Sequence, residues 1–182
     1  MMPRKATLPQ NRINEVASRH LISRIYTAGA GAHAINFNGK STDMNYLSPY
    51  LSFNGKCREA MKFYQDCLGG DLQMQKVSEM PEMAKQMPES YKDSILHSML
   101  TSGPIVIMAS DLSRDKPVMG NTTQLCLNCS TENEIRSLFS NLSAGGQVTE
   151  PLKDMPWNAL YGAITDKFGT QWVFNYDKAQ KN

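Results

Sequence analysis

The feature that most constrains the fold of this chain is a repeated segment, in which an amphipathic helix is followed by two consecutive glycines. The first copy covers residues 63–70 of the 182-residue chain, and the second covers residues 138–146. The glycine pairs begin at Gly69 and Gly145, which are 76 positions apart. A fixed period is typical of a duplicated architecture. Two copies of one module that curve around a shared space would create a cavity for a small molecule.

Hydrophobic periodicity predicts the same order of elements, β-α-β-β-β, around each copy. In the first half, strands are expected at residues 47–53, 71–77, 94–101 and 105–109, with a helix at 56–68. In the second half, strands are expected at 123–129, briefly near 148, at 160–165 and at 170–176, with a helix that opens at the capping box Thr131–Glu134. A long connection through Pro151 and Pro156 is expected to separate the short strand from the final hairpin.

A methionine-rich segment, residues 79–93, separates the second and third strands of the first half. Its prolines favour a long loop with one helical turn. Flexible thioethers adapt to varied apolar ligands, so the segment could form a lid over a cleft. It could equally be a surface turn whose methionines fill a gap, or a contact in a dimer.

The first 43 residues differ from the rest in charge. They carry six Lys or Arg against two acidic residues, whereas residues 44–182 carry 13 basic and 15 acidic side chains. We interpret residues 1–43 as a weakly ordered basic extension or an upstream read-through before Met44, in preference to a transit peptide. The domain is expected at 44–182, with module one at about 45–111 and module two at about 121–178. Its net charge of −2 gives no electrostatic basis for binding nucleic acid.

Three further patterns bear on the class of protein. Apolar runs are too short for a membrane span or a signal peptide. Residues 29–34 match a G-x-G-x-x-A motif, but neither a helix nor a suitably spaced acidic residue follows, which argues against nucleotide binding. Cys126 and Cys129 form a CxxC pattern on a strand, where an odd separation places the side chains on opposite faces. We therefore expect free thiols and a cytoplasmic protein.

Six short motifs together resemble PhnB-like proteins of the vicinal oxygen chelate superfamily, which includes glyoxalase I, bleomycin-resistance proteins and extradiol dioxygenases. They are PYLSFNG at 49–55, FY at 63–64, LGG at 68–70, ILH at 95–97, MASD at 108–111 and TDKFGTQW at 165–172. The resemblance covers residues 45–178. It implies an α+β fold, in which two βαβββ modules with mixed curved sheets enclose a cleft, and it implies a homodimer.

The superfamily also implies a metal held by His and Glu side chains from strands that face the cleft. The corresponding positions here are Ser48, His97, Gln124 and Val173. One imidazole and one neutral amide do not make a catalytic metal centre, which needs at least three good donors. We therefore assign no metal ligand and no cofactor, although a divalent metal bound at other positions stays open.

The alternation of side chains along each strand predicts which residues line the cleft. His97 is the candidate catalytic residue, as a general acid or base, because an imidazole near neutrality suits proton transfer. Trp157 and Tyr161 could wall the pocket or simply pack in the core. The full set of candidate binding residues is Tyr50, Ser52, His97, Met99, Gln124, Cys126, Trp157, Tyr161 and Val173.

The sequence therefore predicts a PhnB-like protein that binds a small organic molecule, and it leaves open whether the protein is an enzyme. One alternative is a metal-dependent lyase, isomerase or dioxygenase of the same superfamily. Another is a protein that sequesters a toxic compound, as bleomycin-resistance proteins do. A methyltransferase is rejected, because the domain lacks a glycine-rich strand-to-helix loop for a nucleotide-like methyl donor.

Overall fold

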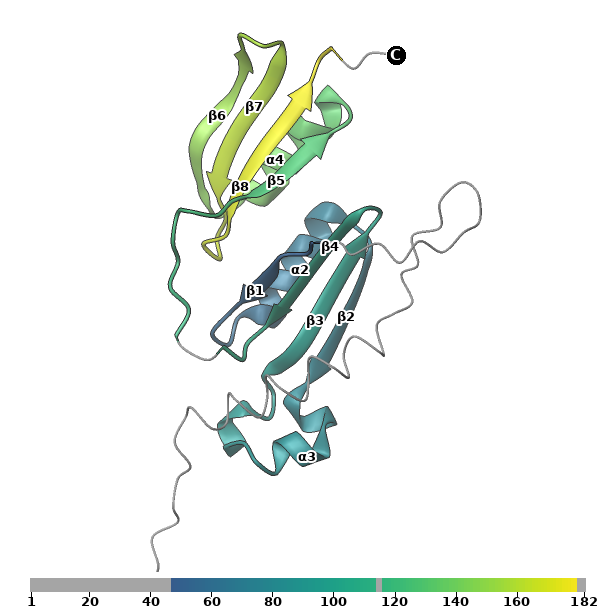
Figure 1. Ribbon diagram of the computed structural model, residues 1–182, viewed down its shortest axis with the longest axis vertical. Coiled ribbons are helices and arrows are strands. Elements are labelled where there is room, and N and C mark those ends of the chain that lie inside the picture. The colour runs from purple at the N-terminus through teal and green to yellow at the C-terminus, as the bar shows by residue number, and fades with distance from the viewer. Residues whose placement is uncertain (1–46, 114–115, 180–182) are drawn as a thin grey trace, which may run out of the picture.

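The computed structural model describes residues 47–113 and 116–179, so the extension expected at 1–43 lies outside the described residues. The described chain forms two modules, each a four-stranded sheet with one long helix packed against it (Figure 1). The first contains β1 (Tyr50–Ser52), α2 (Cys57–Leu68), β2 (Asp71–Lys76), β3 (Ile95–Ser102) and β4 (Ile105–Ser110). The second contains β5 (Leu125–Cys129), α4 (Glu132–Ser143), β6 (Gln147–Met155), β7 (Ala159–Thr165) and β8 (Gln171–Asp177).

The two sheets have the same topology. Their strand orders are β1-β4-β3-β2 and β5-β8-β7-β6. In each sheet the first strand pairs parallel with the last strand, and the other pairs are antiparallel. This arrangement confirms the prediction of an α+β fold with two βαβββ modules and mixed sheets.

The paired glycines have the same two tasks in both modules. Gly69 and Gly145 follow the helices with φ angles of 71° and 75°, in the left-handed region that glycine adopts without strain. A Cβ atom on Gly70 would lie 2.2 Å from the carbonyl oxygen of Thr101, and one on Gly146 would lie 2.4 Å from that of Thr165. The first glycine therefore turns the chain, and the second lets it pass close to a strand.

Each helix buries one face against its own sheet. Ala60, Met61 and Tyr64 of α2 are fully buried, as are Ile135 and Leu142 of α4. Burial of side chains of the size of Met, Leu and Ile contributes about 1.5–3 kcal/mol each. The helix α4 begins as predicted, because the Thr131 hydroxyl accepts a hydrogen bond from the Glu134 amide at 3.1 Å.

The modules contact one another through α2, α4 and the turn between β7 and β8. The ring of Phe168 in this turn lies 6.3 Å from that of Phe53 and 5.8 Å from that of Phe63. Beside it, Tyr64 donates a 2.8 Å hydrogen bond to the buried carboxylate of Asp166. Burial, together with the Asp166 charge, raises the pKa of Tyr64 and keeps its hydroxyl protonated.

Asp166 is fully engaged in hydrogen bonds. One carboxylate oxygen accepts from Tyr64 and from the Trp172 indole at 2.9 Å, and the other accepts from the amides of Phe168 and Thr170. Because Asp166 lies in one module and Tyr64 in the other, this network fixes the turn and joins the modules at the same point.

The structure corrects the prediction for β6. A short strand near residue 148, followed by a long connection, was expected because prolines interrupt strands. Instead β6 continues through Pro151 to Met155 and pairs directly with β7. Its register shifts between Val148 and Glu150 and again between Glu150 and Lys153. An edge strand tolerates a proline at such an irregularity, and Pro151 lies within the second shift, where no pairing partner is needed.

The connection between β2 and β3, which includes the methionine-rich segment, forms three short helical turns. They are η1 (Val77–Glu79), α3 (Pro81–Ala84) and η2 (Glu89–Tyr91). The expected loop with a helical turn is therefore confirmed. In Figure 1 α3 projects beyond the end of the first sheet, at the far end from the second module. Its roles as a lid or a dimer contact stay predictions.

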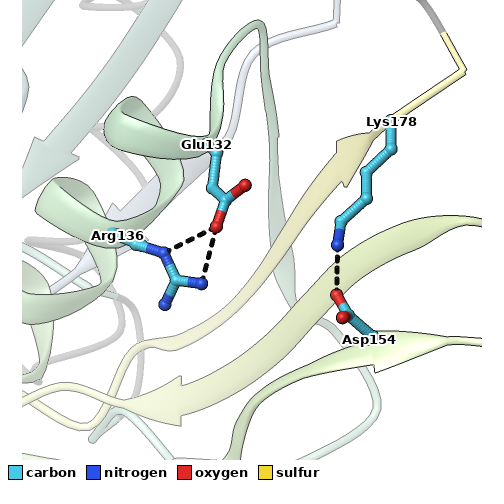
Figure 2. Close-up of polar contacts among 4 residues, drawn as sticks. All are labelled: Glu132, Arg136, Asp154 and Lys178. Carbon is cyan, nitrogen blue, oxygen red and sulfur yellow. Dashed lines mark hydrogen bonds and ion pairs between the residues drawn. The ribbon is translucent and has the colours of Figure 1, made fainter.

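Two polar contacts lie on the surface of the second module (Figure 2). Arg136 contacts Glu132 one turn earlier on α4 at 2.7 Å, and Lys178 contacts Asp154 of β6. Exposed pairs of this kind contribute little to stability. They therefore serve as controls for substitutions in the buried network.

Candidate functional site

Each long helix covers one face of its sheet (Figure 1). No other helix of the described residues covers the opposite face, which we call the open face. In the first sheet the covered face carries Ser98, Leu100 and Ala109, all fully buried, and Cys57 of α2 contacts Ser98 at 3.4 Å. Side chains alternate along a strand, so the neighbours of these residues belong to the open face. His97 and Met99 are among those neighbours.

The open face of the first sheet brings together four predicted site residues. Tyr50 pairs with Met108, which in turn pairs with Met99, so these three side chains form a row across three strands. The ring of His97 lies 6.0 Å from that of Tyr50 at an angle of 33°. Ser52 lies on the same side of β1 as Tyr50.

Sequence reasoning missed three neighbours on this face. Met108 completes the row between Tyr50 and Met99, while Gln73 and Gln75 of β2 pair with Met99 and His97. Alternation along each strand was visible in the sequence. The register that places these residues beside His97 was not visible, because it depends on pairing between strands.

His97 is half-buried, and its Nδ1 atom is buried with no hydrogen-bond partner in the described chain. Burial lowers the pKa of His97, which favours the neutral ring at pH 7. A neutral imidazole carries one proton, and Nδ1 has neither an acceptor for that proton nor a donor for its lone pair. A buried N–H without an acceptor is rarer than a buried lone pair without a donor. We therefore place the proton on Nε2, which makes His97 a potential hydrogen-bond donor.

Asp111 positions the strand that carries His97. Its carboxylate accepts hydrogen bonds from the amide of Cys57 at 2.8 Å and from the amide of Ile95 at 2.9 Å. The same side chain thus joins the start of α2 to the start of β3, two residues before His97. The sequence motif at 108–111 contained Asp111, but alternation gave no reason to select it.

The remaining candidates belong to the second module. Cys126 pairs with Val173 on neighbouring strands, and Tyr161 pairs with Asn175. Gln124 precedes β5, and its amide donates to Gln171 at 3.3 Å. These side chains share the open side of the second sheet, because their strand neighbours, such as Trp172 and Phe174, are buried on the opposite side, where Phe174 contacts Phe139 of α4.

Trp157 lies apart from both groups, in the turn between β6 and β7. Its side chain is 63% exposed. The next residue, Asn158, has a φ angle of 63° and is the non-glycine residue with positive φ in the described chain. The core-packing interpretation is therefore wrong for Trp157, and its proposed place at a pocket wall stays a prediction.

The structure therefore shows two groups of candidate residues, one on each sheet. The contacts between modules in the described chain run through α2, α4 and the turn at 166–170. These contacts fix the position of one group relative to the other within a single chain. That they line a single cleft stays a prediction.

The cysteines behave as the alternation predicts. All four are free thiols; Cys129 is buried and Cys126 is exposed, so the CxxC pair points to opposite faces. Burial raises the pKa of Cys57 to about 12 and that of Cys129 to about 11. Neither thiol is a nucleophile near neutral pH, because the thiolate is the reactive form.

The metal that the superfamily resemblance implies does not fit the residues at the implied positions. In residues 47–113 and 116–179 no three His, Cys, Asp or Glu side chains form a group able to hold an ion. At the implied positions, Val173 offers no donor atom, and Ser48 and Gln124 offer neutral oxygens. Divalent transition metals bind imidazole, thiolate and carboxylate donors far better.

Among the described residues, none of the helices has the length and apolar character needed to cross a lipid bilayer.

Comparisons with known proteins cover both modules. The family model described as the Glyoxalase/Bleomycin resistance protein/Dioxygenase superfamily matches residues 47–174. Protein YjdN of Escherichia coli (strain K12) is 34% identical over 143 residues, which are 74% of this chain and 97% of that protein. The match therefore spans nearly the whole length of that relative.

Solved structures share the fold. Protein PA1353 from Pseudomonas aeruginosa has a TM-score of 0.65 at 36% identity, covering 74% of this chain and 98% of that one. A Bacillus cereus PhnB protein, described as a putative 3-demethylubiquinone-9 3-methyltransferase, has a TM-score of 0.58 at 23% identity, covering 72% of this chain and 99% of that one. The latter likeness bears on the fold alone.

Proposed function

Because the chain belongs to the glyoxalase/bleomycin resistance protein/dioxygenase superfamily, we propose that it binds a small organic molecule on the open face that carries His97. The observation that carries this proposal is the half-buried, neutral His97, whose neighbours on that face include Tyr50 and Met99. Such an arrangement combines apolar contact area with one directional polar group. Small-molecule sites usually have this composition.

His97 is the residue that we expect to act on a bound molecule. Its ring is neutral near pH 7, so one nitrogen can donate a proton while the imidazole as a whole retains the capacity to accept one. In a turnover step, His97 would act as a general acid or base. In a binding protein without turnover, the same nitrogen would hold the ligand by a hydrogen bond.

We further propose a homodimer in the cytoplasm. The helices of residues 47–113 and 116–179 leave the open faces of both sheets uncovered, and a second copy would cover them and exclude water. Four free thiols, two of them buried, are consistent with a reducing compartment.

The test combines binding, turnover and metal content on one preparation. Metabolite-sized compounds are screened by their effect on the melting temperature, and hits are followed by NMR at the methyl groups of Met99 and Met108. We expect His97→Ala to abolish binding of these hits while changing the melting temperature little. Arg136→Ala, which alters an exposed contact on α4, should bind the hits as well as the unmodified protein does.

Several outcomes distinguish the alternatives. Stoichiometric nickel, zinc, iron or manganese, retained after dialysis, would favour the metal-dependent enzyme. Tight binding of a hit without product would favour sequestration. A severe loss of stability in His97→Ala would assign His97 to the core and contradict the proposed site.

A further inference from the structure

The strands of the first sheet are almost free of charged residues. Of the side chains in β1, β2, β3 and β4, only Asp71 and Lys76 are ionic, and they occupy the two ends of β2. Asp71 accepts a hydrogen bond from Gln73 at 3.4 Å, and Lys76 lies 3.8 Å from Asp93. The middle of the open face, around His97 and Met99, therefore carries no ionic side chain of its own strands.

The second sheet differs. Its strands include Glu150, Lys153 and Asp154 on β6 and Asp177 at the end of β8. The lack of charge in the first sheet is thus a property of that sheet and does not reflect the composition of the domain. A ligand that brought its own charge to the first sheet would lose part of its hydration without gaining a counter-charge. Proteins that bind carboxylates or phosphates usually supply Arg or Lys for this reason.

The same face offers an apolar surface. The row Tyr50, Met108 and Met99 runs across three adjacent strands. Methionine side chains are flexible and polarizable, and their sulfur atoms make favourable contacts with aromatic rings. Aromatic side chains such as Tyr50 stack against planar groups. A planar molecule would therefore contact more of this row than a branched one.

Directional polar groups border the row on one side. His97 presents the Nε2–H donor argued above, since its buried Nδ1 has no partner in the described chain. Gln75 pairs with His97, and Gln73 pairs with Met99, so two neutral amides lie on the next strand. These groups can satisfy a carbonyl, ether or hydroxyl oxygen on a ligand without any ionic contact.

From this distribution we infer that the His97 face takes an uncharged, planar molecule that carries a hydrogen-bond acceptor. The inference rests on the proposed function and narrows it to a ligand class. The planar part lies over Tyr50, Met108 and Met99, and its acceptor oxygen receives the Nε2–H of His97. An anionic metabolite would find no counter-charge on the strands around His97 and Met99.

Three matched probes test the inference: coumarin, coumarin-3-carboxylate and naphthalene. Coumarin is planar and neutral with a carbonyl acceptor, the carboxylate adds a charge, and naphthalene lacks the acceptor. Binding is followed by NMR at the methionine methyl groups, with the Met99 signal assigned from Met99→Leu. We expect saturable shifts at Met99 and Met108 with coumarin. Naphthalene should bind about 10-fold more weakly because it loses one polar interaction, and the carboxylate should bind about 10-fold more weakly because its charge loses hydration without a partner.

Two variants and one control sharpen the test. His97→Phe retains a ring but removes the donor. The affinity for coumarin should therefore fall to that for naphthalene, while the affinity for naphthalene should not change. Met99→Lys adds the missing counter-charge and should reverse the preference, making the carboxylate the tighter ligand. Val118→Lys adds the same charge at a side chain that is 89% exposed between the modules, and it should change nothing. Circular dichroism confirms that each variant is folded.

The failures are distinguishable. If coumarin-3-carboxylate binds the unmodified protein as tightly as coumarin, or if coumarin moves no methyl signal, the ligand class is wrong while the hits of the screen can still define a His97 site. If probes and hits shift only methionines away from the face, such as Met83 and Met87, the proposed function itself is wrong.

Discussion

Asp166 shows what a single side chain contributes to this molecule. It is 3% exposed, yet its carboxylate accepts four hydrogen bonds, two from backbone amides and two from the side chains of Tyr64 and Trp172. A buried carboxylate is costly unless its hydrogen-bonding capacity is used. Here it is used by groups from both modules, so the residue couples their packing.

We expect Asp166→Asn to lower the free energy of unfolding by about 2–3 kcal/mol, because an isosteric amide cannot accept from both side-chain donors. Tyr64→Phe removes one of the four bonds and also the 2.8 Å hydrogen bond between the Tyr64 and Thr170 hydroxyls, and it should cost about 1–2 kcal/mol. Urea unfolding followed by tryptophan fluorescence measures both. Arg136→Ala, at the exposed contact of Figure 2, should stay within about 0.5 kcal/mol of the unmodified protein. An Asp166→Asn protein as stable as that control would contradict the role of the network.

His97 makes stability depend on pH in a defined direction. Burial lowers its pKa below the value of about 6.5 that the unfolded chain has. Below pH 6.5 the unfolded state therefore binds a proton before the folded state does. The corresponding stability is present above pH 6.5 and is lost as the pH falls toward the folded pKa.

The urea midpoint of the unmodified protein should therefore fall more between pH 7.5 and pH 5.5 than that of His97→Phe. The nearest ionic side chains on its sheet, Asp71 and Lys76, are present in both proteins, as are His20 and His33. Identical pH dependence of the two proteins would show that His97 titrates normally.

Strand alternation was sufficient to predict that Tyr50, Ser52, His97 and Met99 share a face, because burial imposes a period of two. It was not sufficient to predict the buried, unpaired Nδ1 of His97 or the role of Asp111. These depend on which strand lies next to which, and that information resides in pairing across the sheet.

At the scale of elements, the glycine pairs explain why both helices end as they do. The clash that a Cβ atom would create involves backbone carbonyl oxygens of β3 and β7, which cannot rotate away as a side chain can. The repeat in the sequence is thus a repeat of one helix-to-strand packing arrangement.

We expect Gly70→Ala and Gly146→Ala each to lower the free energy of unfolding by about 2–4 kcal/mol, because the strand must shift to admit the methyl group. Gly120→Ala is the matched control, since no atom lies within 4 Å of a Cβ there and the backbone is not left-handed. It should change stability by less than about 0.5 kcal/mol. Equal effects at all three positions would show that the close approach is not a constraint.

The order of the helices and strands could be predicted because apolar residues recur with a clear period in each helix and in most strands. The full length of β6 could not be predicted, because Pro151 and Pro156 each indicate the end of a strand in the local sequence. Its pairing with β7 outweighs that local signal, and the two register shifts accommodate the proline. Strand ends also differed: β1 is confined to Tyr50–Ser52, whereas residues 47–53 were expected.

At the scale of the whole molecule, the contact between the two modules could not be predicted from the sequence. Tyr64 and Asp166 are 102 positions apart, and nothing in either local pattern indicates that they meet. The family resemblance predicted two modules, and the structure adds that a polar network surrounded by aromatic rings holds them together.

The exposed aromatic side chains bear on assembly. Trp157 is 63% exposed and Tyr50 is 50% exposed, and they lie in different modules. Interfaces are enriched in such residues. In sedimentation velocity we expect the chain at twice its monomer mass, with Trp157→Glu dissociating at least about 10-fold more readily. Val118→Glu, at another exposed apolar side chain, is the control. A monomer at every concentration would contradict the proposed dimer.

The irregular edge strand β6 has a consequence for solubility. At nine residues it is the longest strand described, and it borders its sheet with one side unpaired. A regular strand of that length would be a template for pairing with other chains and for aggregation. Pro151 removes a donor from that edge, and the two register shifts interrupt its regular spacing. Pro151, which made this strand hard to predict from the sequence, therefore also protects the protein against polymerisation through the edge of the sheet.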